Sequence, residues 1–350
     1  MQEKYVHCLK KELKHKLEEV NGRYNITTVY IGGGTPSYID SKYIKEILQI
    51  IKSKNVKLDN AEITIEVNPG TVTKQKLIEY KEAGINRLSI GLQSCNNELL
   101  KAIGRIHTYE QFLDTYSMAR DVGFNNINVD LMLGLPKQTI QDLKLSLNKL
   151  INLNIEHISV YSLILEENTK LYDLVEKKQV TLPDEEQERQ MYWFVKNTLE
   201  LNGYRHYEIS NFAKSGYESK HNVNCWKQKE YIGIGLNASS YIDSERYSNI
   251  ENIKKYIKNI EVERFEENKI IEEQQDEIDK QKEFMILGLR MTEGINVKDF
   301  KNKFEENPIY IFNKELNELV NAKLISIDGD IIKLTNRGLD LANQVWIKFI

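Results

Sequence analysis

Apolar runs alternate with stretches of helical period through the first half of the chain. Runs rich in β-branched residues predict buried strands, and they lie near residues 28–31, 61–67, 87–92, 127–133 and 156–164. Apolar residues recur at helical spacing between these runs, at residues 41–52, 73–83, 108–122 and 139–151. Strands that alternate with helices are typical of βαβ units and a parallel sheet. The pattern therefore predicts an α/β domain, preceded by an amphipathic helix over Gln2–Val20.

The pattern changes after Pro183. A long helical segment ends at Asn202–Gly203, and "RHYEISNFAK" predicts a strand that leads into a loop. Residues 251–283 are highly charged and predict a solvated helical connector. Further on, Asp328–Gly329 lies between two apolar runs and predicts a hairpin that follows short helices. We expect a small winged-helix-like module here, with a structural role.

Composition narrows the class of protein. The chain has 350 residues, which exceeds the usual size of a single core and favours two domains or one barrel with an appendage, and its 41% of hydrophobic residues are enough for a real core. The formal net charge of -4 argues against a general nucleic-acid binder, so we expect no nucleic-acid partner. No apolar run is long enough to span a membrane, and peripheral contact with a membrane stays open. The three cysteines are far apart and odd in number, which excludes a disulfide framework and favours the cytoplasm.

Three adjacent glycines, Gly32 to Gly34, follow the first predicted strand and precede Thr35. A tight turn needs only one glycine, so three in a row indicate a ligand that lies against the backbone. The segment is not a phosphate-binding P-loop, because no lysine follows it. A second glycine pattern, "GIGLNA" at Gly233–Ala238, has the spacing of a dinucleotide fingerprint. The residues after it do not form the helix of a βαβ unit, so we discount it.

Polar residues gather where the predicted strands end. Glu66 ends an otherwise apolar strand, and Gln93, Arg105 and Asp130 hold similar positions. Each of them taken singly is more simply a structural residue. The carboxyl ends of successive strands meet at one edge of an α/β barrel, and that edge carries the active site. We therefore expect these four residues to line one binding pocket.

Seven segments occur in the order seen in one protein family, namely "VYIGGGTPS", "ITIEVNPG", "INRLSIGLQS", "LKAIGRIHT", "NVDLMLGLPKQT", "HISVYSL" and "YEISNFAKSGYESKHNVNCW". Over nearly its whole length the chain resembles the radical S-adenosylmethionine enzymes of the oxygen-independent coproporphyrinogen III oxidase type. Within this family it is more similar to the haem chaperones than to the oxidases. The resemblance implies an α/β fold: a partial (βα)6 barrel without its first strand, followed by a C-terminal helical, winged-helix-like module.

The same resemblance implies a pocket for S-adenosylmethionine. In the family, the glycine-rich strand end lies against the methionine part of the cofactor, which assigns Gly32, Gly33, Gly34 and Thr35 to the site. Glu66 and Asp130 are then expected to contact its amino and ribose ends. Gln93 and Arg105 are expected to hold the polar groups between those ends.

The family's cluster-binding loop, CxxxCxxC, does not occur in this sequence. Three thiolates of that loop hold a [4Fe-4S] cluster in the complete family protein. Cys8, Cys95 and Cys225 do not have this spacing, so we do not expect this chain to hold the cluster. Two explanations compete: the chain is a fragment whose full form carries the loop, or it is a relative that has lost the radical chemistry. The intact pocket motifs favour the fragment.

The segment Lys220–Trp226, "KHNVNCW", is a candidate haem site. A histidine is a common axial ligand of haem iron, although a single histidine is more often a packed residue of a loop. In the family's chaperones an HNxxYW segment is implicated in haem binding, which implies roles for His221, Asn222 and Trp226. His221 is then the expected iron ligand, and the Trp226 ring is expected to cover part of the porphyrin. Cys225 replaces the tyrosine of that segment, and His206 is a weaker candidate ligand.

These observations predict a haem chaperone that delivers haem to an acceptor protein of unknown identity. Oxidative decarboxylation of coproporphyrinogen III is the alternative within the family, and a non-catalytic binding or interaction module is a second alternative. We expect three domains: the partial barrel over 1–182, an extension with the HNxxCW segment over 183–265, and the winged-helix-like module over 266–350.

Overall fold

The fold was analysed in a computed structural model, which describes residues 1–20, 22–53, 58 and 60–350. The chain forms two compact units. The first combines Met1–Thr27, Tyr43–Ala61 and Lys220–Ile350, and the second combines Thr28–Lys42 with Glu62–Ser219. We call them the outer unit and the sheet unit and describe each by itself. The expected division into three domains stays a prediction.

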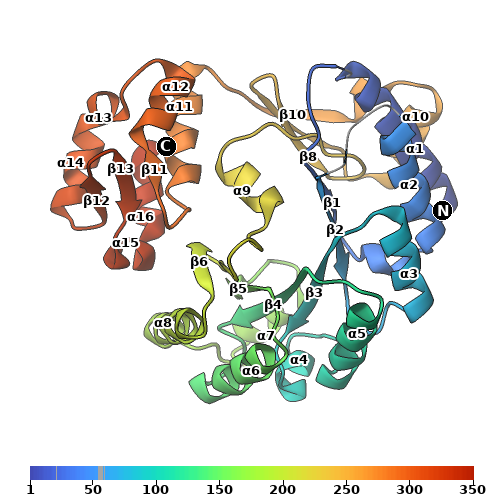
Figure 1. Ribbon diagram of the computed structural model, residues 1–350, viewed down its shortest axis with the longest axis horizontal. Helices are drawn as coiled ribbons and strands as arrows, with labels where there is room; N and C mark the ends of the chain where they lie inside the picture. The colour runs from blue at the N-terminus through green and yellow to red at the C-terminus, as the bar shows by residue number, and fades with distance from the viewer. Residues whose placement is uncertain (21, 54–57, 59) are drawn as a thin grey trace. The chain divides into compact units, whose positions relative to one another are not determined.

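The sheet unit is built on a curved seven-stranded sheet (Figure 1), in the order β1-β2-β3-β4-β5-β7-β6. Strands β1 to β5 pair in parallel and in chain order, which confirms the predicted parallel sheet. The last two strands form an antiparallel hairpin at the edge, where we expected one strand and a loop. The strands are β1 (Thr28–Ile31), β2 (Glu62–Val67), β3 (Arg87–Gln93), β4 (Ile127–Leu133), β5 (His157–Ser162), β6 (Arg205–Glu208) and β7 (Asn211–Ala213).

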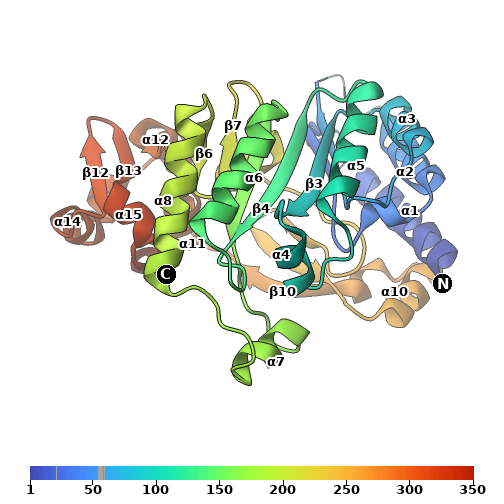
Figure 2. The ribbon, with the colours of Figure 1, turned by 90° about the horizontal axis from the view of Figure 1, so that it is seen from below.

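Helices follow these strands, and Figure 2 shows α5, α6 and α8 along the outer face of the sheet. The helices of this unit are α3 (Lys74–Ala83), α4 (Asn97–Ala102), α5 (Tyr109–Asp121), α6 (Ile140–Asn152), α7 (Lys170–Glu176) and α8 (Glu185–Leu201), with a short 3-10 turn η1 (Pro36–Tyr38). Capping boxes at Thr108, Thr139 and Asp184 start three of them, because each side chain satisfies an amide of the first turn. The sheet core consists of fully buried aliphatic residues such as Ile65 and Ile90.

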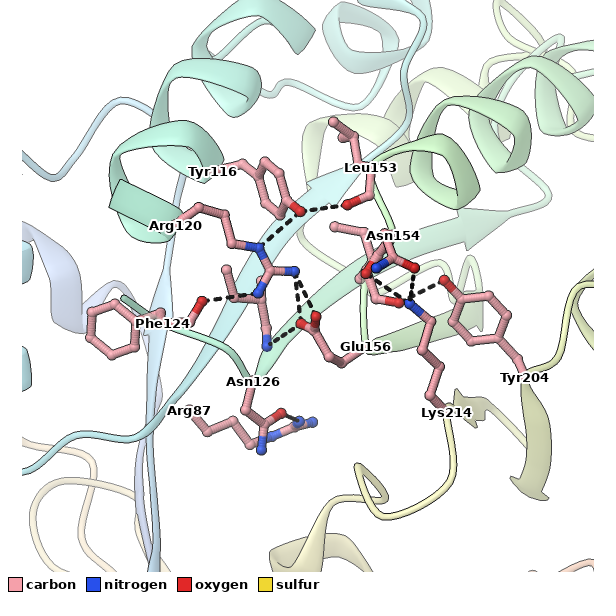
Figure 3. A network of polar contacts seen from close by, with 12 residues as sticks. Arg87, Tyr116, Arg120, Phe124, Asn126, Leu153, Asn154, Glu156, Tyr204 and Lys214 are labelled. Atoms are coloured by element: carbon pink, nitrogen blue, oxygen red, sulfur yellow. Dashed lines mark hydrogen bonds and ion pairs between the residues drawn. The ribbon is translucent and has the colours of Figure 1, made fainter. Parts of the chain in front are cut away.

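A partly buried ion pair holds together the edge at which β4 and β5 begin (Figure 3). Nη2 of Arg120 lies 2.8 Å from both carboxylate oxygens of Glu156. Oε2 of Glu156 also accepts the backbone N–H of Ile127 at 3.1 Å, and Arg120 donates to the hydroxyl of Tyr116 at 2.9 Å. These contacts lie at the start of the strands, so they support the sheet from the edge that the predicted pocket does not use.

The outer unit contains a helical part and a second sheet. The helices are α1 (Gln2–Glu19), α2 (Ser41–Ser53), α9 (Lys220–Trp226) and α10 (Ile253–Glu261). Buried Cys8 of α1 packs against Tyr256 and Ile260 of α10. Buried Glu12 accepts hydrogen bonds from the Tyr256 hydroxyl at 2.5 Å and from Asn249 at 2.6 Å, which ties α1 to the second sheet.

The second sheet corrects the predicted helical connector. It has the order β10-β9-β8, with β8 (Ser239–Ile242), β9 (Glu245–Asn249) and β10 (Lys269–Gln274), and the turn η2 (Phe265–Asn268) precedes β10. Strand β10 lies within the charged stretch that predicted a solvated helical connector, between helix α10 and helix α11 (Glu277–Gly288). Its antiparallel pairing with β9, from Lys269 opposite Asn249 onward, supplies the backbone partners, so long-range pairing overrides the local charge pattern.

The C-terminal part of the outer unit has the expected hairpin. A three-stranded sheet of order β11-β13-β12 packs with helices around a core that includes Phe300, Phe312 and Ile332. Gly329 has a φ of 58° in the turn between β12 and β13, as the Asp-Gly pair predicts. The elements are α11 (Glu277–Gly288), β11 (Ile295–Asn296), α12 (Val297–Phe304), α13 (Pro308–Ile311), α14 (Asn313–Asn321), β12 (Ile325–Asp328), β13 (Ile331–Leu334), α15 (Asn336–Asp340), α16 (Ala342–Trp346) and η3 (Ile347–Phe349).

Candidate functional site

The three positions after β1 require glycine for two different reasons, backbone conformation and lack of space for a side chain. Gly33 and Gly34 have φ values of 83° and 60°, which non-glycine residues rarely adopt. A Cβ atom on either would meet none of the described atoms within 4 Å, so open space lies beside them. At Gly32 a Cβ would come within 2.7 Å of Tyr30 and 2.9 Å of Glu66. The fold itself therefore requires glycine at Gly32, and Gly33 and Gly34 leave open space beside the backbone.

Glu66 holds the glycine segment. Its Oε2 accepts the N–H of Gly33 at 3.1 Å, and its Oε1 accepts the hydroxyl of Tyr30 at 2.8 Å. A carboxylate has about four lone-pair positions, so these two bonds leave capacity for a ligand donor. Burial and the charge of Glu66 raise the pKa of Tyr30 far above its ordinary value, so the tyrosine stays a hydrogen-bond donor.

Asp130 on β4 is the most perturbed of the predicted pocket acids. Burial raises its pKa to about 6, while hydrogen bonds from Asn128 and Ser159 act in the opposite direction. The charge of Glu66 is a smaller contribution to the same upward shift of the pKa. The pKa of Arg105 is lowered by burial, and the charge of Asp130 partly offsets that effect. The charge of Asp130 is thus felt at Arg105, and the charge of Glu66 is felt at Asp130, while the assignment of these residues to one ligand pocket stays a prediction.

Gln93 and Thr35 are joined to this edge by a residue that the sequence pattern did not single out. Gln93 ends β3 after a bulge, with a φ of 72°. Nδ2 of Asn68 donates to the Thr35 hydroxyl at 3.1 Å, and a Cβ on Gly91 would meet Asn68 and Gln93 at 3.1 and 3.3 Å. Asn68 thus links the end of β2 to the segment after β1, and its side chain lies close to Gly91 of β3. Its position in the Asn-Pro-Gly segment directly after β2 is the signal that could have identified it.

A buried hydrogen-bond chain lies behind Asp130. Asn128 donates from Nδ2 to Asp130 at 2.7 Å, and its Oδ1 lies 2.6 Å from Nδ1 of His157. Nε2 of His157 lies 2.8 Å from the Tyr207 hydroxyl, which accepts the backbone N–H of Ser219 at 3.3 Å. Burial lowers the pKa of His157 well below its ordinary value, so the imidazole is neutral. The chain therefore runs from the pocket acid to Ser219, the residue directly before α9.

The described residues do not fit an iron–sulfur cluster. Burial raises the pKa of Cys95 to about 12, so its sulfur is a thiol and not the thiolate that iron requires. Burial also raises the pKa of Cys8 and of Cys225. The one group of three potential metal ligands found among the described residues, His15, Glu19 and Glu266, contains no cysteine. The thiols of the described residues therefore do not supply the ligands of a [4Fe-4S] cluster.

The HNxxCW segment forms helix α9, where we considered a histidine packed in a loop. His221 and Asn222 are half-buried, and Cys225 lies one turn after His221, on the same face. His206 is different, since it is buried, stacks on Phe212 with ring centroids 4.6 Å apart, and has a pKa lowered by burial to about 4. His206 is thus a packed histidine of the sheet unit.

Trp226 ends α9 and already has a neighbour on its ring. The guanidinium carbon of Arg290 lies 4.2 Å from the centroid of the indole. Arg290 thus occupies one face of the indole, and only the other face is left for the expected contact with a porphyrin.

Comparisons with known proteins agree with this fold. The model of the Radical SAM superfamily matches residues 2–150, and that of the HemN C-terminal domain matches residues 275–341. The solved structure of coproporphyrinogen III oxidase (HemN) from Escherichia coli covers 99% of this chain and 82% of its own, with a TM-score of 0.84 and 22% identity. The parallel sheet with polar strand ends is thus the fold of the radical S-adenosylmethionine superfamily.

Sequence comparison gives the particular family. The chain is 37% identical over 352 residues to heme chaperone HemW of Bacillus subtilis, with 99% of this chain and 91% of the relative covered. It is also 37% identical over 325 residues to heme chaperone HemW of Lactococcus lactis, with 93% and 85% covered. The chain belongs to the HemW heme chaperone family. In the part of the chain that the structure describes, no helix is both long enough and apolar enough to cross a membrane.

Proposed function

We propose that this protein is a haem chaperone that binds haem at α9 and passes it to an acceptor protein. The observation that carries the proposal is 37% identity along 99% of the chain to a heme chaperone HemW. The HNxxCW segment supports it locally, because it presents His221 and Asn222 as half-buried residues of a short helix.

His221 is the proposed axial ligand of the haem iron. A neutral imidazole is a strong iron ligand, and the side chain is half-buried, so it is accessible in part. Cys225 lies one turn away, but burial raises its pKa, and a protonated thiol is a poor ligand. We therefore assign one strong protein ligand to the haem and leave Cys225 as a packed neighbour. Asn222 is proposed to orient the imidazole or the bound haem.

The strand-end edge of the sheet unit is proposed as the S-adenosylmethionine pocket. Gly33 and Gly34 supply an open backbone cradle, and Glu66 and Asp130 supply acceptors for the amino and ribose groups. Arg105 and Gln93 are proposed to hold the polar groups between them. The thiols of this chain do not fit a cluster, so the pocket is proposed to bind the cofactor without the anchoring iron and hence weakly.

The oxidase alternative has less support. The likeness to coproporphyrinogen III oxidase is 22% in sequence, which shows the fold alone. A haem-accepting protein as partner and a cytoplasmic location are part of the proposal and follow from the chaperone family and from three unpaired thiols.

A haem titration followed by absorbance tests the proposal. His221→Ala should lower the affinity for haem and shift the Soret band, because the iron loses its protein ligand. His7→Ala replaces an exposed histidine of α1 and is the matched control, which should bind haem like the unmodified chain. His206→Ala should also leave the Soret position unchanged. An unchanged affinity and Soret band in His221→Ala would place the haem elsewhere and remove the local support for the chaperone function.

A further inference from the structure

Three potential metal ligands gather at the end of α1, in the outer unit. His15 and Glu19 are four residues apart on one face of the helix, and Nε2 of His15 lies 3.1 Å from Oε1 of Glu19. Glu266 of η2 comes from a distant part of the chain, and one ligand atom of each of the three residues lies within 4.8 Å of the other two. We call His15, Glu19 and Glu266 the α1 triad.

An aromatic contact holds the triad together. The ring of His15 stacks on that of Phe265, with ring centroids 4.0 Å apart and planes 16° apart. Phe265 directly precedes Glu266, so the contact that orients the imidazole also keeps the second carboxylate beside it. Glu19 and Glu266 are exposed, so an ion can reach them from solvent. The ligands are thus placed by the fold and remain accessible.

A cation already lies between the two carboxylates. Nζ of Lys16 is 3.0 Å from Oε2 of Glu19 and 3.3 Å from Oε1 of Glu266. The C-terminal end of a helix carries partial negative charge, which also favours a positive ion at this place. The Lys16 ammonium lies 5.8 Å from the ring centroid of Tyr247 as well, so that ring offers it a second favourable position if an ion of higher charge displaces it.

The donor set of the triad favours a transition metal ion. One imidazole nitrogen and two carboxylate oxygens suit Zn²⁺ and similar ions, whereas Ca²⁺ and Mg²⁺ take oxygen ligands. Metal–ligand bonds of about 2.1 Å in a tetrahedral site place neighbouring ligand atoms about 3.4 Å apart. The separation of 3.1 Å between His15 and Glu19 is close to that value. Glu19 and Glu266 also line a cleft of the outer unit, which leaves room for water as a further ligand.

We propose that the α1 triad binds a divalent transition metal ion of the Zn²⁺ type. The ion replaces the ammonium of Lys16 between the two carboxylates and ties the end of α1 to η2. The triad shares no residue with the proposed haem site or with the proposed S-adenosylmethionine pocket. The inference is therefore independent of the proposed function.

Calorimetric titration of the full chain with Zn²⁺ tests the site. His15→Ala and Glu266→Gln should each weaken binding at least roughly tenfold to a hundredfold, because even outer-shell partners of a metal contribute that much. His7→Ala is the matched control: His7 is an exposed histidine of α1, four residues after Glu3, and belongs to no triad among the described residues, so it should leave the affinity unchanged. Lys16→Gln should tighten binding, because the competing ammonium is gone.

The opposite signs of these changes separate a metal site from a packing role. Equal affinity in His15→Ala and His7→Ala, or no gain in Lys16→Gln, would overturn the inference. Ca²⁺ should bind far more weakly than Zn²⁺, and equal affinity would reduce the triad to an ordinary acidic surface.

Two further measurements identify where the ion is bound. Co²⁺ bound at the triad should show no thiolate charge-transfer band, and such a band would overturn the inference because it indicates binding at a cysteine. Circular dichroism of the metal-free variants checks that each is folded. His221→Ala should bind Zn²⁺ like the unmodified chain, so failure of the proposed haem site leaves this result distinct.

Discussion

Nδ1 of His157 lies 2.6 Å from Oδ1 of Asn128, and this buried contact joins β5 to β4. Asn128 donates to the pocket acid Asp130, so its oxygen is the acceptor and His157 donates from Nδ1. Nε2 of His157 then accepts the hydroxyl of Tyr207, which in turn accepts the N–H of Ser219. A neutral histidine with both nitrogens used in this way is a structural link, within the sheet unit, between Asp130 and Ser219.

His157→Phe should lower the free energy of unfolding by roughly 2–4 kcal/mol, because it removes two hydrogen bonds and leaves buried partners unmatched. Tyr207→Phe removes only the hydroxyl and should cost less. In denaturant unfolding, the double variant should cost less than the sum of the two single variants, because both act on the same contact. Additive losses would mean that the two residues stabilise the fold independently.

Asp130→Asn should stabilise the protein at pH 7. Burial raises the pKa of Asp130 from 3.8 to about 6, so the folded chain binds this proton more tightly than the unfolded chain. Stability from this group is therefore lost as the pH rises through that interval, up to about 3 kcal/mol in all. The asparagine variant should regain roughly 1–3 kcal/mol at pH 7 and nothing below the lower pKa. The same change should weaken the binding of S-adenosylmethionine.

The measurement is the free energy of unfolding from denaturant titrations across this pH range. Asp114→Asn, at a position of α5 away from the pocket acids, is the matched control and should change the free energy little. A destabilised Asp130→Asn variant at pH 7 would show that the carboxylate is needed for folding and not only for the ligand.

Gly33→Val should abolish the binding of S-adenosylmethionine that calorimetry detects. The side chain would fill the open space beside the glycine, and a φ of 83° strains any β-branched residue by at least about 1–2 kcal/mol. Gly203→Val provides the control, because Gly203 has a φ of 82° and equally open surroundings away from the pocket. Both variants should lose similar stability, and only the first should lose the ligand. If Gly33→Val kept its affinity for S-adenosylmethionine, the glycine run would serve only as a backbone turn and not as a ligand contact.

Anaerobic reconstitution with iron and sulfide should leave this chain without a stable [4Fe-4S] spectrum, and the chain should not cleave S-adenosylmethionine reductively. The reason is that burial holds its cysteines as thiols, with the pKa of Cys95 raised to about 12. Absorption and electron paramagnetic resonance spectra check the first result, and product analysis checks the second. Stoichiometric cluster incorporation that Cys95→Ser or Cys225→Ser removes would contradict this prediction.

Local sequence alone determined most of the elements and the ends of the strands. The alternation of apolar runs and helical periods, the helix end at Asn202–Gly203 and the Asp-Gly turn are short-range signals, and each appears in the fold where it was predicted. The order of the parallel strands follows from the same signals, because short connections place successive strands side by side. For the same reason the sequence is enough to assign Glu66 and Asp130 to one edge of the sheet, where their charges act on each other.

Tertiary structure decided the contacts between residues that are distant in the chain. Strand β10 forms in a stretch with helical charge patterning because β9 supplies its backbone partners. Asn68 links the end of β2 to the segment after β1, and His157 becomes a structural link, only when three or four segments meet around them. The stacking of Trp226 on Arg290 joins positions 226 and 290 in the same way. Periodicity and propensity describe neighbours within a few residues, whereas these contacts depend on loop closure and packing over distances that no local pattern encodes.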